Sequence, residues 1–468
     1  TIDADHNNFI SAIEWSVNNE SAEKGAIVAA AIGEFWITTG HYSTGIRLVE
    51  NILQSSGVLD KPVKSRLLAL TGSLKMDQGD YEQAKKFTKE SLDIRKEIGD
   101  NYGIVVSVNN LGCISFHQGD YDLAKKYFGE SLAINKEIGD KKVIAASMAN
   151  LGNISYYQGD YEQAKEYYKD CLAISKEIGD KKLISISLNS LGSISYVLGD
   201  PEQARKYYEE SLSIRKEFGD KKGSAETINN LGYIANYQGD YDQARKYFNE
   251  SMAISKEIGN KTGIATSMDN LGNTSNTLGD YEQAEKYYKE CLSIYESIGD
   301  RKGMADSMNN LGGVIYAQGD NEQAKTYFEE SLAIKKEFGD RKGMADSMNN
   351  LGRLARHSGD YEQARKYHEG SLVLKKEIGD KPGVANTLIY LALLLELNEK
   401  HFDAIRLLYA AEHTVKSMAA VFDANVEKEK NELTARLNEL LSDDEFAKYR
   451  EEGEKMTLEE ACQLAMGC

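Results

Sequence analysis

The stretch NLGNISYYQGDYEQAKEYYKDCL (150–172) decides the fold of this chain. Its central segment, Gly-Asp-Tyr-Glu-Gln-Ala, starts at Gly159 and is repeated at Gly79, Gly279 and Gly359, with close variants at the other positions of a forty-residue period. A second Gly-Asp or Gly-Asn pair follows each of these segments after twenty residues. Glycine accepts the left-handed conformation that ends a helix, and aspartate caps the next helix. Each unit is therefore predicted to be two helices separated by tight turns.

The apolar residues of this unit fall on one face of each predicted helix. In the second helix, Ala164, Tyr168 and Cys171 follow i, i+4, i+7 spacing, which is typical of a buried stripe. In the first helix, Leu151 precedes Gly152, and a residue without a side chain lets a partner helix approach closely. The chain has 3 prolines in 468 residues, so little interrupts its helices. The pattern predicts a series of helical hairpins.

This pattern resembles the tetratricopeptide repeat. The family's Leu-Gly pair, the alanine after the turn, the aromatic residue four positions later and the small residue three beyond it are found here at Leu151-Gly152, Ala164, Tyr168 and Cys171. The usual repeat has about 34 residues, and the forty-residue unit is similar to the longer repeats of kinesin light chains. The resemblance implies an all-α, right-handed α-solenoid of about ten helical hairpins with a C-terminal helical cap. In such arrays the first helix (helix A) lines a concave groove, and the second (helix B) lies outside it.

We expect four regions along the chain. Residues 1–58 are predicted to be an N-terminal helix and a degenerate first repeat, 59–379 the regular array, 380–417 a degenerate last repeat and 418–468 the capping helices. Helices in the last region are predicted near 424–441, 443–452 and 457–466, with a capping box at Thr457–Glu460. An array needs such a cap because its last repeat otherwise exposes an apolar face.

The composition limits the possible partners. The net charge is −18 and the pI about 5.0, so the surface repels phosphates, and nucleic-acid or anionic-membrane binding is disfavoured. No apolar stretch is long enough to span a membrane, and the start TIDADHNNFI is not a signal peptide. The 5 cysteines show no disulfide or metal-ligand spacing, which favours reduced thiols and a cytoplasmic protein. The start in mid-pattern, without Met, suggests a piece of a longer protein.

Helix A carries two adjacent asparagines in most units, although asparagine is a mediocre helix former. On a helical wheel the two columns border the arc that would face the groove. An amide both donates and accepts hydrogen bonds, so a row of amides is suited to pairing with an extended peptide backbone of any sequence. The varying residues between them would set selectivity. The predicted peptide-binding residues are Asn109, Asn110, Asn150, Asn153, Tyr156, Tyr157, Asn189, Tyr196, Asn229, Asn230, Tyr233, Tyr237, Asn270, Asn273, Asn309, Asn310, Tyr316, Asn349, Asn350, Arg353 and Arg356.

Alternatives stay open for these residues. In one alternative, one asparagine per unit hydrogen-bonds to the neighbouring helix A instead of to a ligand, which would form an interior ladder. In another, the exposed tyrosines only add bulk to the side of the groove and bind nothing. Recent duplication also keeps residues alike, since GDRKGMADSMNNLG occurs at both 299–312 and 339–352. Aromatic residues precede acidic ones and then Arg353, Arg356 and His357 along the predicted groove. This order suits a ligand with an apolar and a charged part.

The sequence contains no recognisable active site. It has no G-x-x-x-x-G-K-[ST] phosphate loop, no H-E-x-x-H and no Cys-x-x-Cys. The 7 histidines are scattered, and we interpret His117 and His357, which fall in one groove column, as polar contacts rather than metal ligands. We therefore predict no catalytic residue, no metal and no cofactor, and a protein that is not an enzyme.

Both ends resemble large signalling ATPases, namely signal-transduction ATPases with numerous domains (STAND) of the MalT-like and AfsR-like kind. The N-terminal features are Asp5-His6-Asn7-Asn8-Phe9, Ala12-Ile13-Glu14-Trp15, Phe35-Trp36 and Gly40-His41-Tyr42, and the tail matches in AIRLLYAAEHT (404–414) and FAKYREEGEKMTLEEACQLA (446–465). The resemblance implies a sensing arm that binds a peptide or protein partner for an ATPase module absent from this chain. A free-standing scaffold for complex assembly, or an array supporting a neighbouring enzyme such as a protease, is the alternative.

Overall fold

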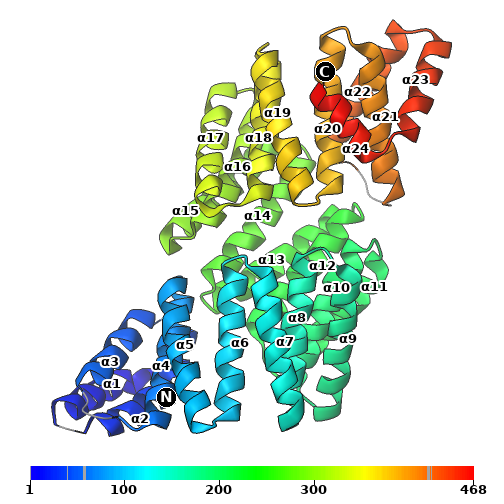
Figure 1. Cartoon of the computed structure of the whole chain (residues 1–468). Helices are drawn as coiled ribbons and strands as arrows, with labels where there is room; N and C mark the ends of the chain where they lie inside the picture. Colours follow the sequence, from blue (N-terminus) through cyan, green and yellow to red (C-terminus); the bar gives the residue numbers. More distant parts are fainter. Residues whose placement is uncertain are drawn as a thin grey trace. The chain divides into compact units, whose positions relative to one another are not determined.

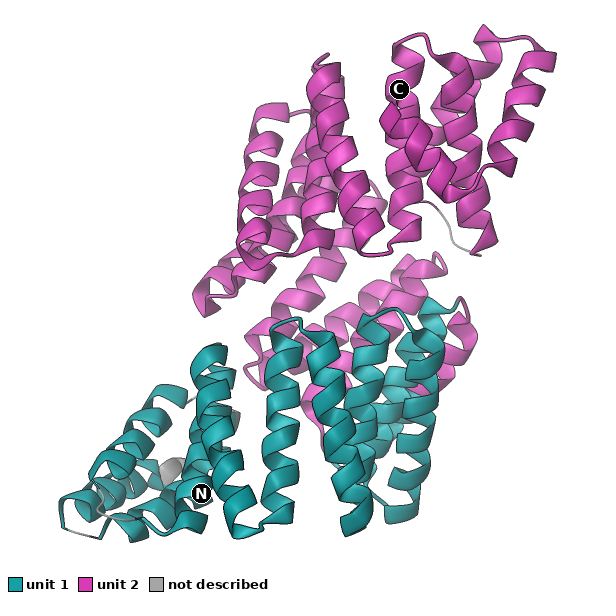
Figure 2. Ribbon diagram, viewed as in Figure 1, with its two compact units in different colours: residues 1–198, 209–218 teal, residues 199–208, 219–468 magenta. Residues whose placement is uncertain are grey.

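The computed structural model describes residues 2–19, 21–39, 41–55, 59–418, 422 and 424–467, and every regular element among them is an α-helix (Figure 1). The chain forms two compact units (Figure 2): unit 1 contains residues 1–198 and 209–218, and unit 2 contains residues 199–208 and 219–468. The boundary divides one helix, α11 (Pro201–Glu217), between the units.

The remaining helices of unit 1 are α1 (Ile2–Asn18), α2 (Ala22–Thr39), α3 (Tyr42–Ser55), α4 (Lys61–Asp77), α5 (Tyr81–Ile98), α6 (Asn101–His117), α7 (Tyr121–Ile138), α8 (Lys141–Tyr157), α9 (Tyr161–Ile178) and α10 (Lys181–Val197). Those of unit 2 are α12 (Lys221–Tyr237), α13 (Tyr241–Glu257), α14 (Lys261–Thr277), α15 (Tyr281–Ile298), α16 (Arg301–Gln318), α17 (Asn321–Phe338), α18 (Arg341–His357), α19 (Tyr361–Glu377), α20 (Lys381–Leu397), α21 (His401–Ser417), α22 (Ala424–Leu440), α23 (Asp443–Lys455) and α24 (Leu458–Gly467). Even-numbered helices from α2 to α20 are the A helices, and their odd-numbered successors are the B helices. The predicted all-α solenoid of helical hairpins is confirmed, whereas the division into four regions stays a prediction.

The turns follow the predicted Gly-Asp chemistry. Gly179 ends α9 with a φ of 68°, in the left-handed region that favours glycine. Asp160 caps the start of the same helix by accepting a hydrogen bond from the Gln163 backbone N–H at 3.1 Å. The last hairpin departs from this pattern, because Glu399, with a φ of 59°, is the only non-glycine residue with positive φ in the described part of the chain.

The Leu-Gly pair fixes how closely the two helices of a hairpin approach. A Cβ atom added to Gly152 of α8 would lie 2.8 Å from Cε2 of Tyr168 on α9, too close for any side chain. Tyr168 and Ala164 are almost completely buried against α8. The helix pair therefore has a tight contact at one point, and the orientation of helix A about its axis is fixed by it.

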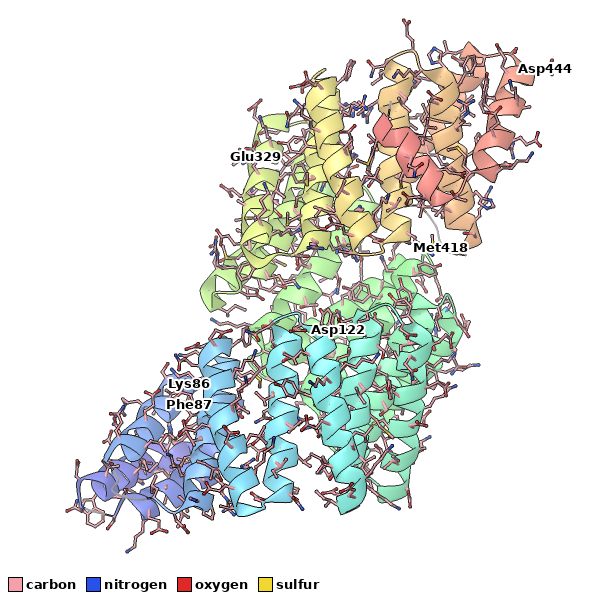
Figure 3. All side chains as sticks on the ribbon, in the orientation of Figure 1. Lys86, Phe87, Asp122, Glu329, Met418 and Asp444 are labelled. Atoms are coloured by element: carbon pink, nitrogen blue, oxygen red, sulfur yellow. The ribbon has the colours of Figure 1, made fainter. Side chains whose placement is uncertain are left out.

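Charged side chains cover the outer surfaces, where Lys86, Asp122, Glu329 and Asp444 are all exposed (Figure 3). Many form ion pairs between the start of a helix A and the end of the next helix B, thirty-six residues later, as in Lys181–Glu217 at 2.9 Å and Arg301–Glu337 at 2.6 Å. Each such exposed pair contributes only about 0–1 kcal/mol. These exposed pairs therefore add little to the stability of the fold.

The three helices after the last hairpin cover its apolar surface. Helix α20 is buried on nearly every side from Val384 to Leu395. Residues of α22 and α24 complete the same core, among them Leu433, Leu437 and Ala461. The predicted capping box is present, since the Glu460 backbone N–H donates to Thr457 Oγ1 at 3.2 Å, while the Thr457 N–H donates to Glu460 Oε2 at 2.8 Å. Within the described residues, no helix is long and apolar enough to cross a membrane.

Candidate ligand-binding faces of the A helices

The two asparagine columns bond to each other. Asn150 Nδ2 donates to Asn109 Oδ1 at 3.2 Å, and this bond joins α8 to the preceding helix A, α6. The same bond occurs twice in unit 2, from Asn270 to Asn229 at 3.1 Å and from Asn350 to Asn309 at 3.2 Å. Asparagine is therefore tolerated in these helices because its amide spans successive A helices, which is the interior ladder that the sequence left open.

Burial follows this bonding. Asn229, Asn270 and Asn349 are only 3–7% exposed, and Asn349 also donates to Thr387 Oγ1 at 2.9 Å. The other members of the two columns are half-buried, and Asn110 donates to Ser73 Oγ at 3.2 Å. Asn189, Asn230 and Asn310 are among these half-buried members. Whether ligands contact these columns stays a prediction, but much of their hydrogen-bonding capacity is used within the protein.

A third asparagine position faces outward. Asn153 on α8 and Asn273 on α14 are exposed, and each accepts a hydrogen bond from the hydroxyl group of a helix-B tyrosine, Tyr168 or Tyr288. Because the amide oxygen is engaged by the tyrosine, the Nδ2 group is left on the open side. Neither Nδ2 has a hydrogen-bond partner among the described residues. These two amides present fixed donors to solvent.

Unit 1 carries a continuous set of aromatic contacts at the ends of α6 and α8. Phe116 lies 5.2 Å from Tyr157 between ring centroids, and Tyr156 lies 5.9 Å from Tyr157. Tyr121 and Tyr161, which begin the following B helices, extend the set. The sequence analysis missed these two, although a tyrosine follows the Gly-Asp pair before most B helices. Of the other predicted tyrosines, Tyr196 is half-buried on α10, and Tyr233 and Tyr237 are exposed on α12 in unit 2.

Unit 2 contains a pocket of about 560 Å³ along α14, α16 and α18. Its lining is rich in amides and aromatic rings, and one wall comes from α22, the first helix after the last hairpin. The residues that line it on the A helices are Asn273, Asn276, Thr277, Asn309, Asn310, Gly313, Tyr316, Ala317, Asn350, Arg353, Arg356 and His357; Gly279, Tyr281 and Tyr288 follow α14, and Asn425, Lys428, Glu429 and Glu432 belong to α22. A concave, polar site with several convergent donors is suited to an extended polar ligand.

The two predicted arginines are already paired in this pocket. Arg353 Nε lies 3.1 Å from Glu429 Oε1, and Arg356 Nη2 lies 2.6 Å from Glu429 Oε2. All three side chains are only 11–14% exposed, and the Arg353 guanidinium lies over the Tyr316 ring at 5.2 Å. Sequence analysis did not identify Glu429, because it lies outside the repeats and no period relates it to the arginines.

One carboxylate interrupts the first asparagine column. Asp269 of α14 accepts hydrogen bonds from Ser307 Oγ at 3.3 Å and from the Tyr295 hydroxyl group at 3.4 Å. Burial raises the pKa of this carboxyl to about 7, although its hydrogen-bond donors oppose the shift. The group is not among the residues that line the pocket of unit 2.

The described residues contain no group of three or more His, Cys, Asp or Glu side chains arranged to hold a metal ion. Four cysteines are free thiols, and burial raises the pKa of Cys113 to about 11, which keeps it protonated and unreactive. Cys468 and Gly40 lie outside the described residues. Cytoplasmic localisation stays a prediction.

Comparisons with solved structures support the fold. A Rap protein in complex with competence and sporulation factor aligns with a TM-score of 0.55 at 14% identity, covering 76% of this chain and 99% of that one. The apo quorum sensor NprR from B. thuringiensis aligns with a TM-score of 0.52 at 15% identity, over 75% of this chain and 99% of that one. A STAND protein with a tetratricopeptide repeat sensor, from Pyrococcus horikoshii, gives 0.52 at 16% identity and covers 76% of this chain but only 54% of its own. A search of curated proteins gives no significant match.

A family model identifies the repeats directly. The tetratricopeptide repeat model matches residues 66–137, 104–177, 143–217, 182–257, 223–297, 263–337, 303–372 and 343–412. These overlapping matches cover most of the chain and include every A helix from α6 to α20. They agree with the Leu-Gly contact and the Gly-Asp turns described above. The chain therefore belongs to the tetratricopeptide repeat family.

Proposed function

We propose that this protein is a non-enzymatic binding module that holds an extended segment of a peptide or partner protein against its A helices. The observation that carries this proposal is the pocket of unit 2, in which amides from α14, α16 and α18 converge around about 560 Å³. Asn273 brings an unpartnered Nδ2 donor to this pocket, and backbone carbonyl groups of an extended segment are natural acceptors for it.

The asparagines have two separate roles in this proposal. Those of the ladder, such as Asn229 and Asn270, hold successive A helices in register. Those of the pocket surface, chiefly Asn273 and Asn310, contact the ligand. This division narrows the predicted site, because a ladder amide that lost its partner would weaken packing rather than binding.

A matched pair of variants tests the division. Asn153 and Asn273 occupy the same position in the repeat and accept the same tyrosine hydrogen bond, but only Asn273 lines the pocket. Peptides that bind the full chain would be selected from a displayed random library, and their affinity would be measured by fluorescence polarisation. We expect Asn273→Ala combined with Asn310→Ala to weaken binding at least about tenfold, the loss of one or two ligand hydrogen bonds, and Asn153→Ala to leave it unchanged. Equal binding by all variants, or failure to select any peptide, would contradict the proposal.

We further propose that the module is the sensing arm of a signalling ATPase. This part is supported by the fold shared with the repeat sensor of the Pyrococcus horikoshii STAND protein, and by the two terminal stretches that resemble that class. A ligand would act on the ATPase by binding two of its states with different affinity. The test is the full reading frame that encodes this chain: a phosphate loop and a winged helix upstream support the proposal, and their absence favours a free-standing adaptor.

A further inference from the structure

Helix α22 has two faces with different roles. Val426, Leu433 and Leu437 are buried in the core that α22 shares with α20 and α21. On its other face, Asn425, Lys428, Glu429 and Glu432 form a wall of the unit 2 pocket. A segment from outside the repeats thus lies where the proposed ligand would run.

The repeat itself does not require the arginines that Glu429 meets. At the position of Arg353 the other units carry Cys113, Asn153, Ser193, Tyr233, Asn273 and Gly313. Arg353 and Arg356 are one turn apart on α18, and two guanidinium groups so placed form a receptor for a carboxylate. Tyr316 and Tyr390 lie beside the Arg353 guanidinium at 5.2 and 5.8 Å and hold it in place.

Glu429 does not saturate this receptor. Arg356 Nε is buried and has no hydrogen-bond acceptor among the described residues, although Nη2 of the same side chain binds Glu429 Oε2. A buried donor without a partner costs free energy, which a ligand bringing a further acceptor would recover. A ligand carboxylate that also reached this Nε would make a contact that Glu429 does not make.

Ion pairs supply much of what holds α22 in place. Lys430 lies 3.6 Å from Glu412 on α21, and Arg436 donates to Glu396 of α20 at 3.1 and 3.2 Å. With Glu429, three residues of α22 form such ion pairs, as many as the three apolar residues that it buries, Val426, Leu433 and Leu437. Contacts of this kind have a modest net free energy, because desolvation offsets the attraction between the charges. The helix is accordingly a wall that a competing charge is able to displace.

We propose that α22 is a built-in competitor of the bound segment: Glu429 supplies to Arg353 and Arg356 the carboxylate that an acidic side chain of the partner supplies when it binds. The ligand is thus an acidic peptide segment, and its binding and the docking of α22 exclude each other. This inference rests on the proposed function, because it assumes that the pocket takes a ligand. An intramolecular competitor acts at an effective concentration of about 1 mM, so removing its carboxylate opens the site to micromolar ligands.

The probe is a fluorescein-labelled peptide with the sequence of residues 424–440, which carries the groups known to fit the site, and a second peptide with Gln in place of Glu429. Three full-length chains are compared: wild type, Glu429→Gln and Glu439→Gln. The last is the matched control, because Glu439 is an exposed carboxylate on the same helix that does not line the pocket. Glutamine keeps the shape of the side chain, and circular dichroism verifies that each variant folds.

We expect the Glu429→Gln chain to bind the labelled peptide at least tenfold more tightly than the wild-type and Glu439→Gln chains do. We expect it to bind the Gln-containing peptide no better than those two chains do. Equal binding of both peptides by all three chains, or no binding by any, would show that α22 is a fixed wall. In a second measurement, peptides selected from the random library should displace the labelled peptide from the Glu429→Gln chain. Selected peptides that bind without displacing it would overturn this inference and leave the proposed function intact.

Discussion

The hairpins α8/α9 and α18/α19 place different chemistry on the same framework. Both have a glycine whose added Cβ would lie within 3 Å of the opposing ring, Gly152 against Tyr168 and Gly352 against His368. Around this contact the residues differ at three equivalent positions: Asn153, Tyr156 and Tyr168 in the first hairpin, and Arg353, Arg356 and His368 in the second. The repeat thus determines where a side chain lies, and the identity of that side chain determines what the surface can bind.

The difference extends to what covers each hairpin. The α8 side carries exposed rings, with Tyr157 59% exposed, and contacts between aromatic groups. The α18 side carries two guanidinium groups covered by α22 through Glu429. Cationic side chains are buried at this position because a helix from outside the array supplies their counter-charge. Unit 2 therefore contains a site whose charge balance depends on a non-repeat segment.

Glu429→Ala should have the largest effect on this contrast. It leaves Arg353 and Arg356 close together without their counter-ion, and removing one partner of a buried ion pair costs about 3–5 kcal/mol. We expect α22 to detach before the repeats unfold, which hydrogen exchange of the α22 amides would detect as lost protection. Glu432→Ala is the control and should leave the exchange of α22 nearly unchanged. Full protection in both variants would mean that the apolar face of α22 alone holds it.

The pH dependence of His368 comes next. Burial, together with the nearby charges of Arg356, Arg353 and Lys375, lowers the pKa of this imidazole to about 3. The folded state thus keeps the ring neutral, while the unfolded state binds a proton below about pH 6.5. The contribution of this ring to stability is complete above that pH and is lost as the pH falls towards 3, by about 2–3 kcal/mol at pH 4.5.

A variant isolates this residue. His368→Phe places at α19 the ring that Phe328 provides in the preceding hairpin. Urea unfolding at pH 7.5 and 4.5 should show a smaller acid-induced loss of free energy in the variant than in the wild type. Equal losses would mean that other groups dominate the acid sensitivity of unit 2.

Sequence analysis recovered the framework because its rules are local. The turn at Gly159-Asp160 and the contact of Gly152 with Tyr168 depend on residues within about two helical turns of each junction, and the period repeats the same signal many times. The asparagine ladder was harder to predict from the sequence, because the hydrogen bond from Asn150 to Asn109 depends on the rotation between successive A helices. A helical wheel gives the face of a single helix and not this rotation.

The pocket could not be completed from the sequence for a different reason. Glu429 lies seventy-six residues from Arg353, in a helix that shares no period with the repeat, so no column of the array contains it. The available signal was indirect: the hairpin containing α18 is the only one of the regular array with two cations at the groove positions. Two buried positive charges require a negatively charged partner, but the aligned columns alone do not identify which residue it is.

Asp269→Asn tests the one carboxylate in the first asparagine column, where other units carry a ladder amide. The raised pKa of Asp269, about 7, means that folding favours the protonated carboxyl, so this group contributes most to stability below its unfolded pKa. The contribution falls as the pH rises through 7. Asparagine, which occupies this position in α12 and α16, carries no charge at any pH. The variant should gain about 1–3 kcal/mol over the wild type at pH 8 and much less at pH 5, measured by thermal unfolding at both. An equal effect at the two pH values would locate the cause in packing instead.

Tyr157→Ala should have the smallest effect, and it tests the aromatic side of the comparison. Tyr157 corresponds to His357 of α18 and contacts Phe116, Tyr121 and Tyr156 with ring centroids 5.2–6.0 Å apart. Such contacts are worth about 0.5–1.5 kcal/mol when buried, but most of this ring is in water, so we expect a loss of about 1 kcal/mol or less in the free energy of unfolding. Tyr361→Ala is the control, an exposed tyrosine that makes no ring contact with another described residue. If Tyr157→Ala instead lowered the free energy of unfolding by more than about 2 kcal/mol, the rings would hold α6/α7 against α8/α9 as Glu429 holds α22 against α18. The α8/α9 hairpin, like α18/α19, would then depend on contacts outside the Leu-Gly framework.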